Sequence, residues 1–359
     1  FAHVFVAANY LAIGPCLAIP RTSSTSFEMF EPLLPAGLSL EVARLVFSVV
    51  FFTVAYLLAM HPNALTRLLG RITGPALIAL LVFVIGAALF DPASSLEAAH
   101  ATYASAPAMS GFLTGYQTMD LLASLTFGIV IATNIRELGV TDDAGLTREV
   151  SRAGVFAGVL MGIIYCGLAL VGVNIAAVLP GATNGAEILA ASAGQHFGTV
   201  GTVVVAAIFL LACLNVCIGL ISCCGTYFSD EFPRIPYRVW ALGFAVFSCV
   251  VSNFGLDAIL TFSVPLLNAM YPMAIVLVVM GMLHKVCDGM PAVWPCAVGL
   301  TAVVSIATSL RDAFFTGAWL PFDVLPFADL GMNWVVPALL GALIGVVVSF
   351  AGKKPQSAS

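Results

Sequence analysis

Ten long apolar stretches, separated by short polar connections, set the class of this chain. A helix rises about 1.5 Å per residue, so crossing the roughly 30 Å hydrocarbon layer of a bilayer takes about 20 apolar residues. Charged residues make up 9% of the chain and hydrophobic residues 61%, whereas soluble domains have about 25% and 45–50%. The apolar runs are continuous and lack the period-two alternation of a β-barrel. The sequence therefore predicts an all-α, polytopic helical membrane protein. Its predicted spans lie near 1–19, 41–60, 74–90, 111–135, 153–178, 199–227, 238–254, 258–283, 292–310 and 333–351.

The distribution of basic residues predicts how these spans are oriented. If ten spans alternate and the chain ends in the cytoplasm, all of the 13 basic residues except Arg21, Arg44 and Arg311 fall on the cytoplasmic side. That bias is the positive-inside pattern of multi-pass membrane proteins, and a count shifted by one span would destroy it. We therefore expect a single transmembrane domain over 1–352 and a short cytoplasmic tail over 353–359.

Side chains with catalytic or metal-binding chemistry are scattered along the chain. Its nine cysteines and five histidines have no convincing metal-ligand spacing, and motifs such as HExxH and GxSxG are absent. The four cysteines of the span near 199–227 are interpreted as small apolar packing residues. The sequence thus predicts that the protein is not an enzyme, needs no cofactor and binds no nucleic acid.

The segment 110–128 is unusual for a span with a purely structural role. It holds Asp120, the one acidic residue well inside a predicted span, and an ionisable group at that depth is costly unless it faces a partner or water. Glycine, serine and threonine residues around it ease a local break in the helix. A broken helix exposes peptide groups that bind ions and amino-acid termini at the bilayer midplane. Two interpretations stay open: Asp120 belongs to a transport site, or it pairs with a neighbouring helix near the outer interface.

A second polar feature lies in the segment 211–222. Asn215, Gly219 and Ser222 are spaced by four and then three residues, so one helical face carries all three. Such a face either packs closely against another helix or offers oxygen ligands to a hard cation. The residues by themselves favour close packing.

A third unusual segment is 9–28, near the start of the chain. Gly14, Pro15 and Pro20 predict a helix that kinks and then ends. Tyr10 precedes the kink and carries a hydroxyl that needs a partner, so it is a candidate to line a cavity.

Four stretches of the chain resemble the bacterial branched-chain amino acid:cation symporters. The resemblance runs from residue 1 to about residue 350, in order and with matching spacing. The four stretches are Tyr10 to Glu28 with its Ile-Pro-Arg-Thr and Ser-Phe-Glu motif, Gly115 to Asp120 leading to Phe127 and Gly128, Cys213 to Phe228, and Ser263 to Pro272.

The resemblance implies a leucine-transporter-like fold of twelve helices in inverted repeats. Members import leucine, isoleucine and valine with sodium across the bacterial plasma (inner) membrane. In that plan the ten spans are helices three to twelve, and two helices are missing upstream of Phe1. The first of those is a broken helix that supplies much of the substrate site, so we expect that this chain by itself cannot transport. The implied partners are the amino acid substrate and the lipid bilayer, with no obligate protein partner.

The resemblance also implies roles for individual residues. The helix break falls around Thr118 to Ser124, where the backbone meets the charged groups of the substrate and apolar side chains meet its side chain. The carbonyl of Ala212 and the side chain of Asn215 contribute to a sodium site. The implied substrate-binding residues are Tyr10, Thr118, Met119, Asp120, Leu122 and Ser124.

Two places depart from the family pattern. The family usually has two consecutive hydroxyl residues where Asn215 and Val216 stand, and a glutamate where Thr226 stands. Val216 offers no side-chain ligand to a sodium ion, whereas Asn215 still presents an amide oxygen. The prediction is a sodium-coupled importer of branched-chain amino acids that works by alternating access. Proton coupling through Asp120 and a membrane receptor without flux are the alternatives.

Overall fold

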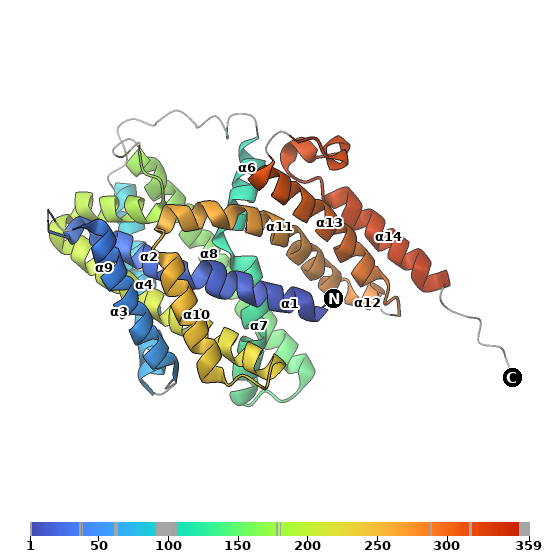
Figure 1. Ribbon diagram of the computed structural model, residues 1–359, viewed down its shortest axis with the longest axis horizontal. Coiled ribbons are helices and arrows are strands. Elements are labelled where there is room, and N and C mark those ends of the chain that lie inside the picture. The colour runs from blue at the N-terminus through green and yellow to red at the C-terminus, as the bar shows by residue number, and fades with distance from the viewer. Residues whose placement is uncertain are drawn as a thin grey trace. The chain divides into compact units, whose positions relative to one another are not determined.

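The computed structural model of the chain describes residues 2–35, 37, 39–60, 64–90, 103, 106–176, 179, 181–287, 289–315 and 318–351. These residues form two compact units, each treated by itself below. Unit 1 comprises Phe1–Asn9, Ala99–Thr126 and Leu260–Ser359, and unit 2 comprises Tyr10–Ala98 and Phe127–Ile259. All regular secondary structure among the described residues is helical (Figure 1). The tail predicted over 353–359 lies outside the described residues.

The helices follow the apolar runs of the sequence, and several short helical turns connect them. In chain order they are α1 (Ala2–Leu11), η1 (Ala12–Ala18), α2 (Ile19–Phe30), η2 (Glu31–Leu33), α3 (Leu40–Met60), α4 (Ala64–Phe90), α6 (Pro107–Thr114), η3 (Gly115–Thr118), α7 (Asp120–Glu137), α8 (Asp143–Ala176), α9 (Gly185–Glu231), α10 (Tyr237–Ser252), α11 (Leu256–Met282), α12 (His284–Cys287), α13 (Val293–Phe314), η4 (Pro321–Val324), η5 (Ala328–Leu330) and α14 (Val335–Ala351).

Enough of these helices can cross a bilayer to confirm a polytopic helical membrane protein. Among the described residues, six are long and apolar enough: α3, the part of α4 from Arg71 to Phe90, α8, α9, α11 and α13. The bent pair formed by Pro107–Thr118 and α7 passes the same test as one broken span, and α10 and α14 are shorter apolar helices. The total of ten spans stays a prediction.

Unit 2 is built around α9. Its cysteine-bearing face packs against α2, where the side chains of Cys213 and Cys217 lie beside Ser26 and Thr22. Small side chains of this kind let two helix backbones approach closely, which is the main source of helix association in lipid. The packing interpretation of these cysteines is thereby supported for the pair that faces α2.

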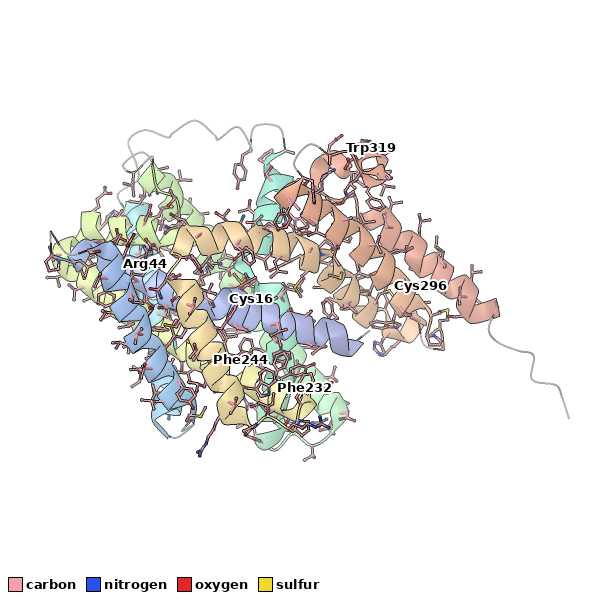
Figure 2. All side chains as sticks on the ribbon, in the orientation of Figure 1. Cys16, Arg44, Phe232, Phe244, Cys296 and Trp319 are labelled. Carbon is pink, nitrogen blue, oxygen red and sulfur yellow. The ribbon has the colours of Figure 1, made fainter. Side chains whose placement is uncertain are left out.

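An aromatic cluster joins the end of α9 to α10 within unit 2. The ring of Phe228 lies 5.1 Å from that of Trp240 and 5.5 Å from that of Phe244, and Phe232 lies 6.1 Å from Trp240. Phe232 and Phe244 of this cluster are labelled in Figure 2. Such ring separations are typical of favourable aromatic pairs. The cluster holds the short turn between the two helices.

In unit 1, α13 and α14 run side by side (Figure 1). Gly341 and Gly345 of α14 are four residues apart, and a Cβ atom at either position would collide with the backbone of α13 at Cys296 or Val293. This is the small-xxx-small packing of membrane helices, in which glycine removes the side chain that would hold the backbones apart.

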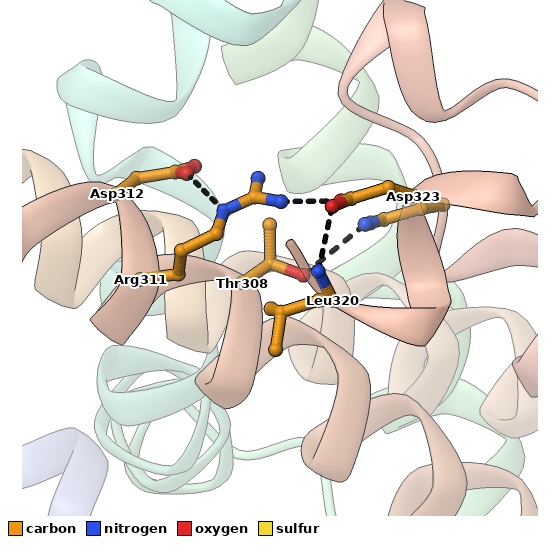
Figure 3. Close-up of polar contacts among 6 residues, drawn as sticks. Thr308, Arg311, Asp312, Leu320 and Asp323 are labelled. Carbon is orange, nitrogen blue, oxygen red and sulfur yellow. Dashed lines mark hydrogen bonds and ion pairs between the residues drawn. The ribbon is translucent and has the colours of Figure 1, made fainter. Parts of the chain in front are cut away.

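The connection between α13 and α14 is fixed by an ion pair. The guanidinium of Arg311 donates to the carboxylate of Asp323, and the backbone N–H of Leu320 donates to the same carboxylate over 2.9 Å (Figure 3). Arg311 also donates to Asp312 over 2.8 Å. These contacts tie the segment after α13 to the last turn of that helix.

The prediction that the first helix ends at Pro20 is wrong. The kink is present, because Gly14 has the non-helical angles φ −73° and ψ −108° inside η1. However, α2 then runs from Ile19 to Phe30. Pro20 lies in the first turn of α2, where a missing N–H removes no helical hydrogen bond, so the proline starts a helix rather than ending one.

Two segments that lie between predicted spans, just before residues 153 and 199, also contain helix. α8 begins at Asp143, and the Asp142 carboxylate accepts a hydrogen bond of 2.7 Å from the N–H of Gly145. α9 begins at Gly185, where Asn184 caps the helix by accepting from the N–H groups of Ala186 and Glu187. Polar capping residues mark helix starts as well as loops, which explains both differences.

Candidate functional site

The helix formed by residues 107–137 is broken at one residue. The 3-10 turn η3 ends at Thr118, Met119 adopts the left-handed conformation with φ 65° and ψ 4°, and α7 begins at Asp120. The helices on the two sides are bent by 42°. A left-handed residue interrupts the α-helical hydrogen-bond pattern, and this conformation is uncommon outside glycine.

The break is narrower than the predicted segment from Thr118 to Ser124. Leu122 and Ser124 lie in regular helix, because the N–H of Ala123 already donates to the carbonyl of Met119 over 2.9 Å. A single left-handed residue is enough to end one helix, and an acidic residue in the next position favours the start of another. The break itself therefore comprises Thr118 and Met119.

Peptide groups at the break are available for a ligand. The first N–H groups of α7, such as those of Leu121 and Leu122, have no acceptor within the helix. They also carry the positive end of the helix dipole, which attracts anionic groups. Thr118 and Ser124 donate to nearby carbonyls over 2.7 Å, at Gly115 and Leu121 respectively. Their hydroxyl oxygens can therefore still accept hydrogen bonds.

Asn9 fixes α1 to α7 within unit 1. Its Nδ2 donates to the carbonyl of Leu122 over 3.0 Å, and the side chain is only 2% exposed. The other amide atom, Oδ1, is buried and has no hydrogen-bond partner among the described residues. Sequence reasoning missed this residue. The only signal for it was an asparagine in an otherwise apolar run.

Two stacked tyrosines lie at the same break. The rings of Tyr116 and Tyr271 are 4.5 Å apart and nearly parallel, and both side chains are 4% exposed. The hydroxyl of Tyr271 lies beside the Thr118 side chain and the backbone N–H groups of Met119 and Leu121. Tyr271 belongs to α11, the helix that contains Pro265 and Pro272. Its hydroxyl was also missed from sequence, because the spacing of prolines says nothing about which residue faces the break.

Asp120 stands in the first turn of α7, next to the break. Its side chain is partly buried and has interaction partners. Its carboxylate lies close enough to the hydroxyl of Tyr271 to interact with it electrostatically. A carboxylate at a helix N-terminus is favoured by the helix dipole. This position suits a transport role and a structural pairing equally well, so the two interpretations of Asp120 stay open.

Tyr10, the remaining predicted substrate contact, belongs to unit 2. Its ring stacks on that of Tyr227 at 4.2 Å, and its carbonyl lies 3.6 Å from the Sγ atom of Cys224. The side chain is buried. The substrate role of Tyr10 stays a prediction.

The predicted sodium ligands also belong to unit 2, on α9. Asn215 and Ala212 are half-buried, and Val216 is 50% exposed. The hydroxyl of Tyr237 donates to Ser222, at the far end of the predicted polar face, over 3.4 Å. That end of the face therefore packs against α10, as the close-packing interpretation predicts. The sodium role of Asn215 and Ala212 stays a prediction.

Apolar helices of spanning length and a helix broken in mid-span define a class of protein. They are the features of membrane transporters that bind their cargo at a broken helix. Comparison with known proteins gives the family. Residues 1–351 match the family described as branched-chain amino acid transport protein.

Individual relatives agree with this match. The chain is 36% identical to the branched-chain amino acid permease BraB of Bacillus subtilis, over 99% of the chain and 81% of the relative. It is 37% identical to the branched-chain amino acid transport system 2 carrier protein of Pseudomonas aeruginosa, over 99% and 80%. It is 32% identical to the branched-chain amino acid permease BrnQ of Escherichia coli K12, over 98% and 79%. The chain belongs to the branched-chain amino acid transport protein family, whose members are membrane permeases rather than enzymes.

Proposed function

We propose that this protein imports leucine, isoleucine and valine across the bacterial plasma membrane by sodium symport and alternating access. The observation that carries the proposal is the break at Thr118 and Met119, which leaves the first N–H groups of α7 without helical acceptors. A zwitterion far from bulk water needs such groups, because lipid offers no hydrogen bonds. The names of the relatives supply the substrate class.

Apolar side chains next to the break suit a branched aliphatic substrate. Met119 and Leu122 are both buried. Each buried methylene contributes about 0.8 kcal/mol, so a pocket of this kind prefers leucine over alanine. A single methylene gives only about 10- to 200-fold discrimination. Broad selectivity among leucine, isoleucine and valine is the expected result.

The coupling ion has two candidates. Asn215 and the carbonyl of Ala212 offer oxygen ligands to sodium, as the family resemblance implies. The second candidate is a proton carried by Asp120, and the observation that favours it is the position of this carboxylate in the residue after the break. Sodium coupling is the proposal, and proton coupling is its rival.

Uptake of labelled leucine by proteoliposomes that contain the purified full-length protein tests the function. We expect excess unlabelled isoleucine or valine to inhibit uptake strongly, and lysine or aspartate to have no effect. Inhibition by lysine equal to that by isoleucine would contradict the apolar pocket. Absence of uptake with leucine binding intact would favour a receptor.

A matched pair of variants tests the coupling ion. Asp120→Asn removes the carboxylate at the break, and Asp143→Asn removes the first-turn acid of α8, which pairs with Arg136 over 3.2 Å. Under sodium symport, a sodium gradient drives uptake in both variants. The rival makes two different predictions: Asp120→Asn alone loses uptake, and a proton gradient without sodium drives uptake by the wild type. These two results together would show that the coupling ion is a proton and not sodium.

A further inference from the structure

Four buried polar atoms of unit 1 have no hydrogen-bond partner among the described residues: Asn9 Oδ1, the hydroxyls of Tyr116 and Tyr271, and Trp334 Nε1. Tyr116 and Trp334 lie beside each other, whereas Asn9 and Tyr271 both lie beside the start of α7. A buried polar atom without a partner is costly, and native proteins contain few of them. Two such atoms beside one helix N-terminus therefore indicate groups that are satisfied by a ligand.

The amide of Asn9 can adopt only one orientation. The carbonyl of Leu122 accepts hydrogen bonds and cannot donate, so the Nδ2 side of the amide must face it. This contact leaves Oδ1 as an acceptor next to the first turn of α7. The amide oxygen can receive a hydrogen bond from an ammonium group.

The hydroxyl of Tyr271 has the opposite chemistry. It lies beside the N–H groups of Met119 and Leu121 and beside the Thr118 side chain, but it forms a hydrogen bond with none of them. Because the two N–H groups are donors, the hydroxyl proton is directed away from them. The stack on Tyr116 holds the ring in place. The hydroxyl and the first N–H groups of α7 together form a set of donors at the positive end of a helix dipole, which suits a carboxylate.

We propose that Asn9 and Tyr271 bind the main-chain groups of the amino acid: Asn9 Oδ1 accepts from its ammonium group, and the Tyr271 hydroxyl donates to its carboxylate. This inference rests on the proposed function and adds two residues to the site. Both act on groups that all amino acids share. Affinity for leucine, isoleucine and valine therefore depends on them equally, and selectivity among the three does not.

Binding to the purified full-length protein in detergent tests the roles with two leucine analogues. 4-Methylpentanoate lacks the ammonium group, and 3-methylbutylamine lacks the carboxylate. Asn9→Ala should weaken leucine binding about tenfold but leave 4-methylpentanoate binding unchanged. Tyr271→Phe should weaken leucine binding about tenfold but leave 3-methylbutylamine binding unchanged.

Two control variants match these changes. Tyr237→Phe removes the hydroxyl of a tyrosine of unit 2, which donates to the carbonyl of Ala59 over 3.0 Å. Asn174→Ala removes an asparagine that likewise donates to a helix carbonyl, that of Ala88 over 2.6 Å. Both controls should bind leucine within about twofold of the wild type.

The outcomes separate the inference from the proposed function. If leucine and its analogues weaken by the same factor in Asn9→Ala and in Tyr271→Phe, the two residues act only on structure and the inference is overturned. If the controls lose as much leucine affinity as the test variants, it is overturned as well. Wild-type protein that fails to bind leucine contradicts the proposed function itself.

Discussion

Asn9 and Leu122 are 113 residues apart in sequence and are joined by a hydrogen bond of 3.0 Å between the Asn9 amide and the Leu122 carbonyl. The bond fixes the end of α1 to the first turn of α7, directly after the helix break. A polar contact that bridges two apolar helices is one of the few directional constraints available in lipid. This hydrogen bond therefore helps to fix the position of the break relative to α1.

The left-handed conformation of Met119 gives the first prediction. Isoleucine is branched at Cβ and tolerates positive φ poorly, so Met119→Ile should lower stability by about 1–2 kcal/mol and reduce leucine uptake. Met119→Gly fits the same backbone without strain and should keep the break and the uptake, with weaker preference for leucine over alanine. Uptake and thermal unfolding of both variants check this. An equal loss of leucine uptake in both variants would show that uptake depends on the Met119 side chain and not on its backbone conformation.

Glu28 predicts a dependence of stability on pH. It lies in the last turn of α2, which is not among the described helices of spanning length, and burial raises the pKa of its carboxyl to about 7 from 4.5. Glu31, Asp257 and Glu187 raise this pKa further, whereas Arg44 lowers it. The folded protein thus holds a proton that the unfolded chain releases, so stability falls as pH rises between about 4.5 and 7.

A variant isolates this effect of Glu28. Glu28→Gln imitates the protonated carboxyl, so its unfolding temperature at pH 8 should approach that of the wild type at pH 5. Glu149→Gln, which removes a half-buried partner of Arg152, should retain the wild-type pH dependence. The attribution to Glu28 would be refuted if the unfolding temperature of the wild type rose from pH 5 to pH 8. It would also be refuted if the unfolding temperature of Glu28→Gln changed with pH as steeply as that of the wild type.

The ion pair of Arg311 and Asp323 is expected to protect the connection between α13 and α14 from proteases. The Leu320 N–H and the Arg311 guanidinium lower the pKa of Asp323 below its usual value (Figure 3). Stability from a lowered acid pKa is present above the unfolded value and lost as pH falls through the folded one. Asp323→Asn should therefore speed chymotrypsin cleavage within 318–330 at neutral pH.

The control for this prediction is Asp329→Asn, an exposed acid on the same connection. It should be cleaved at the wild-type rate. The wild type should also stay resistant at pH 5, where Asp323 is still ionised. Cleavage of Asp323→Asn at the wild-type rate would show that other contacts hold the connection.

The positions of most helices could be predicted because continuous apolar runs leave few alternatives in lipid. α3, α10, α11, α13 and α14 each begin or end within a few residues of the predicted spans. The helical segment that begins α9 at Gly185 was missed because it is short and mixed in polarity before the bend at Gly198. The total of ten spans and the sodium ligands stay predictions.

The site was predictable only in part. Polar and small residues in an apolar run located the break, since they remove the packing and propensity that keep a helix continuous. Asn9 and Tyr271 could not be assigned to it, because their neighbours at residues 118–122 lie more than a hundred residues away in sequence. Only the tertiary structure brings such residues together.

Accumulation of labelled leucine in proteoliposomes tests the central claim most directly. With sodium outside and none inside, the full-length protein should concentrate leucine above its external level, and a sodium ionophore should release it. Tyr237→Phe should accumulate leucine like the wild type, and Met119→Ile should not. Leucine that only equilibrates across the membrane, or that enters equally well without a sodium gradient or a proton gradient, would contradict coupled transport at the break.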